Sequence, residues 1–193
     1  MKAEDMPGGH SIPVTNRQKW TFLKVVCYFL YLAVGKRLPD GLGPIGRISM
    51  RIRRIISRPL LKGAADVFGI YSGVDFGNGS CLVMKEHANI GKNSTLQGNG
   101  TITIGKHVIM GHSCFILTQN HKYLNPEGYD GCVVKDVLID DHAWLGHCVI
   151  ILPGVRVGKH AIIGAGAVVS RSVSDYAIAV GNPAKVVKFR NAR

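Results

Sequence analysis

Aliphatic residues recur at every sixth position between residues 139 and 169. The series is Ile139, Leu145, Ile151, Val157, Ile163 and Val169. A helix would repeat its apolar face every three or four residues and a half-buried strand every two, so six fits neither alone. A hexad repeat is typical of a parallel β-helix, in which each hexad supplies one short strand and one corner. An apolar β-sandwich that is periodic by coincidence is the alternative, and six consecutive hexads argue against it.

A second inward-facing series precedes the first by two residues and is dominated by small side chains. Its members are Val137, Ala143, Val149, Val155, Ala161 and Ala167. Glycine often follows the large aliphatic residue, as at Gly146 and Gly158, and we expect it there because a tight corner needs backbone angles that other residues avoid. With two-residue slips, the period extends back to Ile70. The pattern predicts a mainly β protein with a hexapeptide-repeat β-helix over residues 63–173.

The period breaks once, between Ile116 and Ile139. The intervening segment contains the turn signals Asn-Pro, Glu-Gly and Asp-Gly. We therefore expect an excursion loop over residues 118–136, extending from one corner of the β-helix. A long loop in a compact solenoid is usually either functional or disordered.

The charge of the chain is concentrated in its N-terminal extension. Residues 1–62 hold twelve Lys or Arg against three acids, +9, whereas residues 63–193 hold twelve against nine, +3. Residues 20–34 are almost wholly apolar but too short for an ordinary membrane span, and no small-residue cleavage site follows them. We expect neither a transmembrane helix nor a signal peptide there.

Residues 45–58 alternate isoleucine and arginine at helical spacing, which predicts a basic amphipathic helix. Our preferred interpretation packs its isoleucine face on the end of the β-helix and leaves the arginines in water. The alternatives are contact with an anionic membrane surface and attraction of a phosphate-bearing acceptor. We expect no nucleic-acid partner, because no nucleic-acid-binding motif accompanies the charge. Five scattered cysteines without a secretion signal favour the cytoplasm, with possible association with the inner face of the membrane.

Two C-terminal segments carry a resemblance to a known family: "AWLGHCVIILPGVRVGKHAIIGAGAVVSRSV" and "DYAIAVGNPAKVVKF". Over about residues 66–190 the chain resembles the hexapeptide-repeat acyltransferases of left-handed parallel β-helix fold, in the branch of galactoside, maltose and surface-polysaccharide O-acetyltransferases. The segment "KRLPDGLGPIGR" is similar to the polysaccharide group. The resemblance implies a homotrimer that binds acetyl-CoA between subunits and transfers the acetyl group to a saccharide hydroxyl without a metal. It also implies that residues 174–193 form a tail packed on the β-helix.

The resemblance further assigns candidate site residues. His121 in "CFILTQNHKY" matches the catalytic histidine that opens the excursion loop, where an imidazole can deprotonate the attacking hydroxyl. His112 and His142 are weaker candidates for this base. Residues matched to the acetyl-CoA site are Trp144, Gly146, His147, Gly164, Ala165, Ser170, Arg171 and Lys185. Residues assigned to the acceptor are Asn93, Asn120 and Tyr123. His147 departs from the family, in which this position is usually small or polar.

Each assignment has a structural alternative: His121 as a solvated loop residue, the glycines as corners, and Lys185 as part of a solvated basic tail. Three other functions also remain open. One is N-acetylation of a nucleotide-sugar amine. Another is a metal-dependent protein similar to γ-class carbonic anhydrases, for which the available histidines are His107, His112, His142 and His147. The third is a noncatalytic β-helix scaffold.

Overall fold

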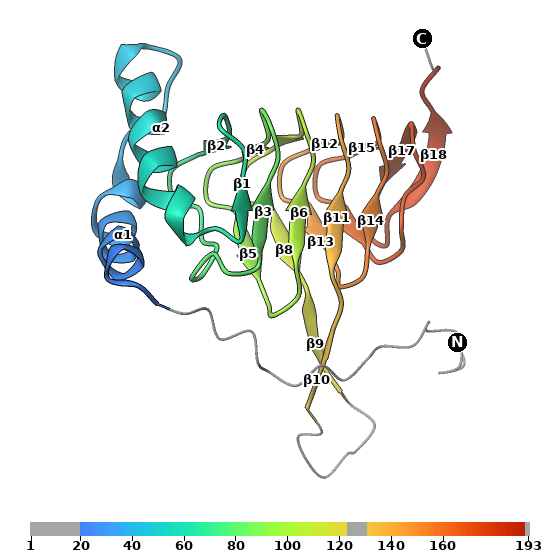
Figure 1. Cartoon of the computed structure of the whole chain (residues 1–193). Helices are drawn as coiled ribbons and strands as arrows, with labels where there is room; N and C mark the ends of the chain where they lie inside the picture. Colours follow the sequence, from blue (N-terminus) through green and yellow to red (C-terminus); the bar gives the residue numbers. More distant parts are fainter. Residues whose placement is uncertain (1–19, 123–130, 192–193) are drawn as a thin grey trace.

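The computed structural model describes residues 20–122 and 131–191 as a short helical cap followed by a left-handed parallel β-helix (Figure 1). The cap consists of α1 (Phe22–Ala33), η2 (Gly35–Arg37), α2 (Pro44–Ser57) and η3 (Arg58–Leu60). It lies at one end of the stacked coils, and β17 and β18 lie at the other. No helix among the described residues has the length and apolarity needed to cross a membrane.

The coils build three faces, which we number in the order in which the chain visits them. The first face consists of β1 (Gly63–Ala64), β3 (Leu82–Met84), β6 (Ile102–Ile104), β11 (Val137–Ile139) and β14 (Arg156–Val157). The second face consists of β2 (Gly69–Ile70), β4 (Asn89–Ile90), β7 (Ile109–Met110), β12 (Trp144–Leu145), β15 (Ile162–Ile163), β17 (Ala177–Val180) and β18 (Lys185–Phe189), which pairs antiparallel with β17. The third face consists of β5 (Thr95–Gln97), β8 (Phe115–Leu117), β13 (Ile150–Ile151) and β16 (Val168–Val169).

The hexad period predicted from the sequence is confirmed by the strand register. Leu145 pairs with Ile163 and Ile151 with Val169, so one coil is three hexads long. The two-residue slips lengthen the earlier coils, where Met84 pairs with Ile104. Both inward series are buried and form one continuous hydrophobic core along the axis.

The reason given above for the corner glycines is wrong. Gly146 and Gly158 do not have a positive φ, whereas the residue two positions later often does, as at Cys148 (φ 56°) and His160 (φ 56°). The glycines are needed because stacked coils approach closely: a Cβ on Gly146 would lie 2.6 Å from the backbone nitrogen of Ala165. Close contact between coils, not backbone angle, therefore selects glycine at this position.

The left-handed positions between the first and second faces carry a ladder of stacked rings. The ladder consists of His87, His107, His142, His160 and Tyr176. Neighbouring ring centroids are 4.7 to 5.0 Å apart, and the planes are within 18° of parallel. One ring from each successive coil thus lines this corner.

The basic helix packs on the end of the β-helix as predicted, but mostly not through its isoleucines. α2 does pack on the β-helix, but its buried residues are Gly46, Ser49, Arg53 and Ser57. Ile45, Ile48 and Ile55 are instead 55 to 70% exposed. These three isoleucines point to solvent, whereas Ile56 packs against the core beside the row of small residues and the fully bonded Arg53.

Arg53 is completely buried and connects the cap to the first coil. Its guanidinium donates hydrogen bonds to the backbone oxygens of Gly35 (3.0 Å), Ile70 (3.3 Å), Pro39 (3.0 Å) and Leu38. It also forms an ion pair with Asp40 at 2.8 Å. A buried arginine is tolerated only when its donors are satisfied in this way.

α1 contacts the β-helix through a narrow stripe that includes Cys27 and Tyr31, its only buried residues. The Tyr31 hydroxyl donates a hydrogen bond to the backbone oxygen of Val74 at 2.9 Å. Burial raises the pKa of Tyr31 well above its usual value, so the phenol stays protonated and keeps this bond. Tyr28 also packs against the core, and the opposite side of the helix is exposed.

Candidate functional site

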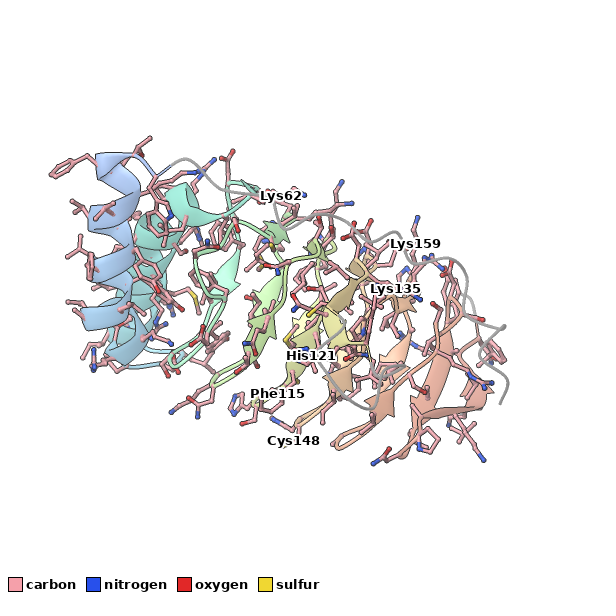
Figure 2. All side chains as sticks on the ribbon, turned by 90° about the horizontal axis from the view of Figure 1, so that it is seen from below. Lys62, Phe115, His121, Lys135, Cys148 and Lys159 are labelled. Carbon is pink, nitrogen blue, oxygen red and sulfur yellow. The ribbon has the colours of Figure 1, made fainter. Side chains whose placement is uncertain are left out.

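The excursion begins and ends as a two-stranded arm that leaves the corner between the third and first faces (Figure 1). β9 (Gln119–His121) pairs antiparallel with β10 (Cys132–Val134). This pairing places His121 directly opposite Cys132 and leaves its side chain exposed. Seen from below, His121 lies near the middle of the molecule, with Phe115 and Cys148 on one side of it and Lys135 on the other (Figure 2).

A chain of polar contacts leads from the β-helix to the imidazole of His121. Asn99 Nδ2 donates a hydrogen bond to Gln119 Oε1 at 2.8 Å, and Gln119 Nε2 donates to Cys132 Sγ at 2.8 Å. Cys132 Sγ lies 3.6 Å from His121 Nδ1. If Nδ1 carries the ring proton and donates it to this sulfur, Nε2 is left as the basic nitrogen. No sequence pattern indicates Cys132 and Gln119 as site residues, because the antiparallel pairing that brings them to His121 has no periodic signal.

Five residues matched to the donor site gather at the corner between the second and third faces, which we call the donor corner. Trp144 in β12 precedes the corner and is 51% exposed. Gly146 and His147 follow it, and Gly164 and Ala165 occupy the equivalent place one coil later. The row of small residues continues to Gly111 in the preceding coil, where an added Cβ would lie 2.6 Å from the carbonyl carbon of Gly146. The donor corner is therefore a narrow edge, and the exposed indole of Trp144 lies beside it.

Two side chains at the donor corner have fixed hydrogen-bond roles. His147 Nδ1 accepts a hydrogen bond from the backbone N–H of His112 at 3.0 Å, so in the neutral ring the proton lies on Nε2. The single S–H of Cys114 has the backbone oxygens of Gly146 (3.2 Å) and Gly111 (3.4 Å) within reach as acceptors. Burial raises the pKa of Cys114, which keeps the thiol protonated and unreactive beside the corner.

The remaining predicted residues are dispersed. Ser170 and Arg171 follow β16, at the corner between the third and first faces, and Lys185 opens β18; all three are exposed. Asn93 lies at the donor corner in an earlier coil, with φ 56°. Asn120 is on the arm beside His121, and Tyr123 lies outside the described residues.

The histidines considered for a metal site lie at two different corners. His107 and His142 belong to the ring ladder between the first and second faces, whereas His112 and His147 lie at the donor corner. Over residues 20–122 and 131–191, no three His, Cys, Asp or Glu side chains form a group that could hold a metal ion. The four histidines therefore do not make a common site within one chain.

His121 and the donor corner lie on opposite sides of the third face within one chain. β8 runs from the donor corner at Cys114 to Leu117, and the arm starts only after that strand. The width of the third face therefore separates the predicted base from Trp144 and Gly146. A second copy whose donor corner faced this arm would bring the two halves together.

Comparisons with known proteins identify relatives of this chain. Residues 136–171 match the family model described as bacterial transferase hexapeptide (six repeats). A galactoside O-acetyltransferase from Lactococcus lactis is 38% identical over 100 residues, covering 51% of this chain and 48% of that protein. A putative acetyltransferase from Saccharomyces cerevisiae is 30% identical over 134 residues, covering 69% and 68%. The chain thus spans about half the length of the first relative and two thirds of the second.

Solved structures give the same fold. A maltose O-acetyltransferase from Clostridium difficile superposes with a TM-score of 0.71 at 25% identity, covering 88% of this chain and 87% of that one. A hexapeptide-repeat acetyltransferase from Vibrio cholerae, solved with acetyl-CoA, gives a TM-score of 0.70 at 23% identity, covering 86% of each chain.

Proposed function

The chain belongs to the hexapeptide-repeat acyltransferase family, and on this premise we propose that it transfers an acetyl group from acetyl-CoA to a saccharide hydroxyl. The observation that carries the proposal is the exposed imidazole of His121, held on an arm opposite Cys132. The donor corner supplies the second half: a narrow edge of glycine and alanine with exposed Trp144 beside it. An extended pantetheine chain fits such an edge, since no large side chain projects from its glycine and alanine positions.

The proposed reaction is a direct transfer. His121 Nε2 takes the proton of the acceptor hydroxyl as its oxygen attacks the carbonyl carbon of the thioester. The new C–O bond forms, the C–S bond breaks, and the proton passes from His121 to the departing CoA sulfur. A positioned general base contributes about a hundred- to ten-thousand-fold to such a step.

We also propose that the working unit is a homotrimer. A single chain holds His121 and the donor corner on opposite edges of its third face, so neither half of the site is complete alone. A cyclic trimer would place the arm of each subunit beside the donor corner of its neighbour, which gives three complete sites.

The proposed acceptor is a precursor of a surface or capsular polysaccharide. Support comes from the similarity of residues 36–47 to the polysaccharide O-acetyltransferase group and from the position of Asn120 on the arm next to His121. Within the described structure, the arm carries the side chains that could contact a sugar bound in front of the imidazole.

The test compares His121→Ala with wild type, using release of CoA thiol in the presence of extracted surface glycan. We expect kcat to fall by about a hundredfold or more while acetyl-CoA binding stays unchanged, because only the base is lost. His87→Asn is the matched control: that histidine is also half exposed, and asparagine tolerates its left-handed backbone. Near-wild-type kcat for His121→Ala with saturating acceptor would remove His121 from the mechanism.

The acetylated product distinguishes the proposal from its alternatives. Mild alkali hydrolyses an O-acetyl ester but leaves an N-acetyl amide intact. An alkali-stable product would replace the proposal with N-acetylation of an amino sugar. If neither wild-type acetyl transfer nor acetyl-CoA binding is measurable, the scaffold alternative takes its place.

A further inference from the structure

The outward side of α1 is apolar along its whole length. Six of its side chains are large, hydrophobic and exposed: Phe22, Leu23, Val25, Val26, Phe29 and Leu30. Phe22 is 86% exposed, and no charged side chain lies among the exposed residues of the helix. A contiguous exposed apolar face of this kind marks a site of contact with a protein or a membrane.

The exposed surface of α2 divides lengthwise into an apolar strip and a basic strip. Ile45, Ile48 and Ile55 form the apolar strip at spacings of three and seven residues. Arg47 and Arg51 lie beside it at a spacing of four and are exposed. Both helices belong to the same end of the molecule (Figure 1). This end therefore presents hydrophobic side chains bordered by arginine.

Among residues 20–122 and 131–191, no carboxylate neutralises the basic strip. The carboxylates near the cap are already paired, Asp40 with Arg53, Asp66 with Arg58, and Asp75 with Lys36. Within the part of the chain that the structure describes, neither Arg47 nor Arg51 forms an ion pair with a carboxylate. Their charge is available to an external anion.

We propose that the helical cap docks on the surface of an anionic lipid bilayer. The apolar faces of α1 and α2 would enter the boundary between headgroups and acyl chains, with Arg47 and Arg51 at the level of the lipid phosphates. α1 has 12 residues and is about 18 Å long, well short of the hydrocarbon core of about 30 Å. The helix therefore lies in the plane of the interface.

Charge complementarity selects this occupant over a second copy of the cap. Two identical caps meeting face to face would bring like-charged arginine strips together, which opposes association. An anionic bilayer supplies the opposite charge and an apolar interior at the same surface. The cytoplasmic leaflet has this composition, and each well-placed arginine increases binding to it about fivefold before salt screening.

The experiment is flotation of the full chain with vesicles of phosphatidylcholine containing phosphatidylglycerol, and with vesicles of phosphatidylcholine alone. We expect binding to the anionic vesicles that weakens from low to physiological salt. Phe29→Ser should lower the partition coefficient about tenfold or more, since a ring is withdrawn from the apolar boundary. The double variant Arg47→Gln/Arg51→Gln should lower it about twentyfold at low salt.

Matched controls lie far from the cap. Phe189 in β18 is 60% exposed, close to the 64% of Phe29, and Lys106 and Lys159 are exposed basic residues of the β-helix. Phe189→Ser and Lys106→Gln/Lys159→Gln should bind vesicles like the wild type. The proposal is overturned if the intact chain floats equally poorly with both vesicle types, or if Phe29→Ser and Phe189→Ser have equal effects. Failure to bind anionic vesicles would leave an acidic protein surface as the partner of the cap, and the acetyl-transfer assay is unaffected by either outcome.

Discussion

His121 depends on its neighbours for the state in which it can act as a base. The general base in the proposed transfer must be unprotonated at the nitrogen that faces the hydroxyl, so the other nitrogen has to donate its proton to something. Cys132 Sγ is positioned to accept it and is itself held by Gln119. The thiol therefore acts as a positioning group for the imidazole.

We predict that Cys132→Ala lowers kcat about two- to tenfold, the value of one ordinary hydrogen bond, while KM for acetyl-CoA stays constant. Cys132→Ser should recover most of the loss, because a hydroxyl oxygen can accept the same proton. Steady-state kinetics of the two variants measures the difference. Equal kcat for alanine and serine would show that the contact is structural only.

The sequence predicted the burial of residues that repeat in every coil, but it did not predict contacts that occur only once in the structure. Burial of Ile139 or Ala143 follows from the hexad period alone, since every coil imposes the same inward positions. The pairing of His121 with Cys132 occurs once, across an excursion without a period, and could not be read in that way. No pattern in the sequence indicated that Arg53 is buried, because its backbone acceptors come from distant positions that only the fold brings together.

At the scale of elements, the cap is held to the β-helix by buried polar contacts as well as by apolar packing. Arg53 of α2 bonds to backbone oxygens on both sides of the cap and to Asp40, whose carboxylate also accepts the backbone N–H of Ser72 at 3.0 Å. This arrangement leaves Ile45, Ile48 and Ile55 of α2 free to face outward. Hydrophobic periodicity correctly predicted a helix here and incorrectly predicted which side packs.

Replacing Arg53 should therefore be far more damaging than replacing an exposed arginine on the same helix. We predict that Arg53→Met lowers the free energy of unfolding by about 3–5 kcal/mol, because Asp40 and several carbonyl groups lose their buried partner. Arg51→Met, at an exposed position, should change it by less than about 0.5 kcal/mol. Urea unfolding of both variants provides the comparison, and similar midpoints would contradict the role given to Arg53.

At the scale of the whole molecule, the two halves of the proposed site lie on different edges of one β-helix. The family resemblance led us to expect a shared donor site, and the strand order gives a physical reason for it, since the third face lies between His121 and Trp144. The sequence period predicts each face of the β-helix, but it carries no information about how two β-helices contact each other. The contact between subunits therefore stays a prediction.

Subunit mixing tests it directly. His121→Ala and Trp144→Ala should each be poorly active, but mixed trimers formed by co-expression should regain about a quarter of wild-type activity, since random assembly gives that share of intact sites. Activity of the co-expressed mixture would be compared with that of the two variants purified separately and combined without exchange. No recovery in verified mixed trimers would place the complete site within one chain.

The arm is attached to the β-helix at a point where the arm and the coils can change independently in evolution. Thr118 and Lys135 meet at its base, where the backbone N–H of Lys135 donates to the oxygen of Thr118 at 2.9 Å. Ile116 and its partner Ile151 are 35 residues apart, against 18 for Ile151 and Val169, so the excess falls between two ends that already touch. A lineage can therefore lengthen, shorten or exchange the arm without disturbing the stacking of the coils. Under the proposed function, acceptor preference would then change in evolution while the donor corner is inherited unchanged.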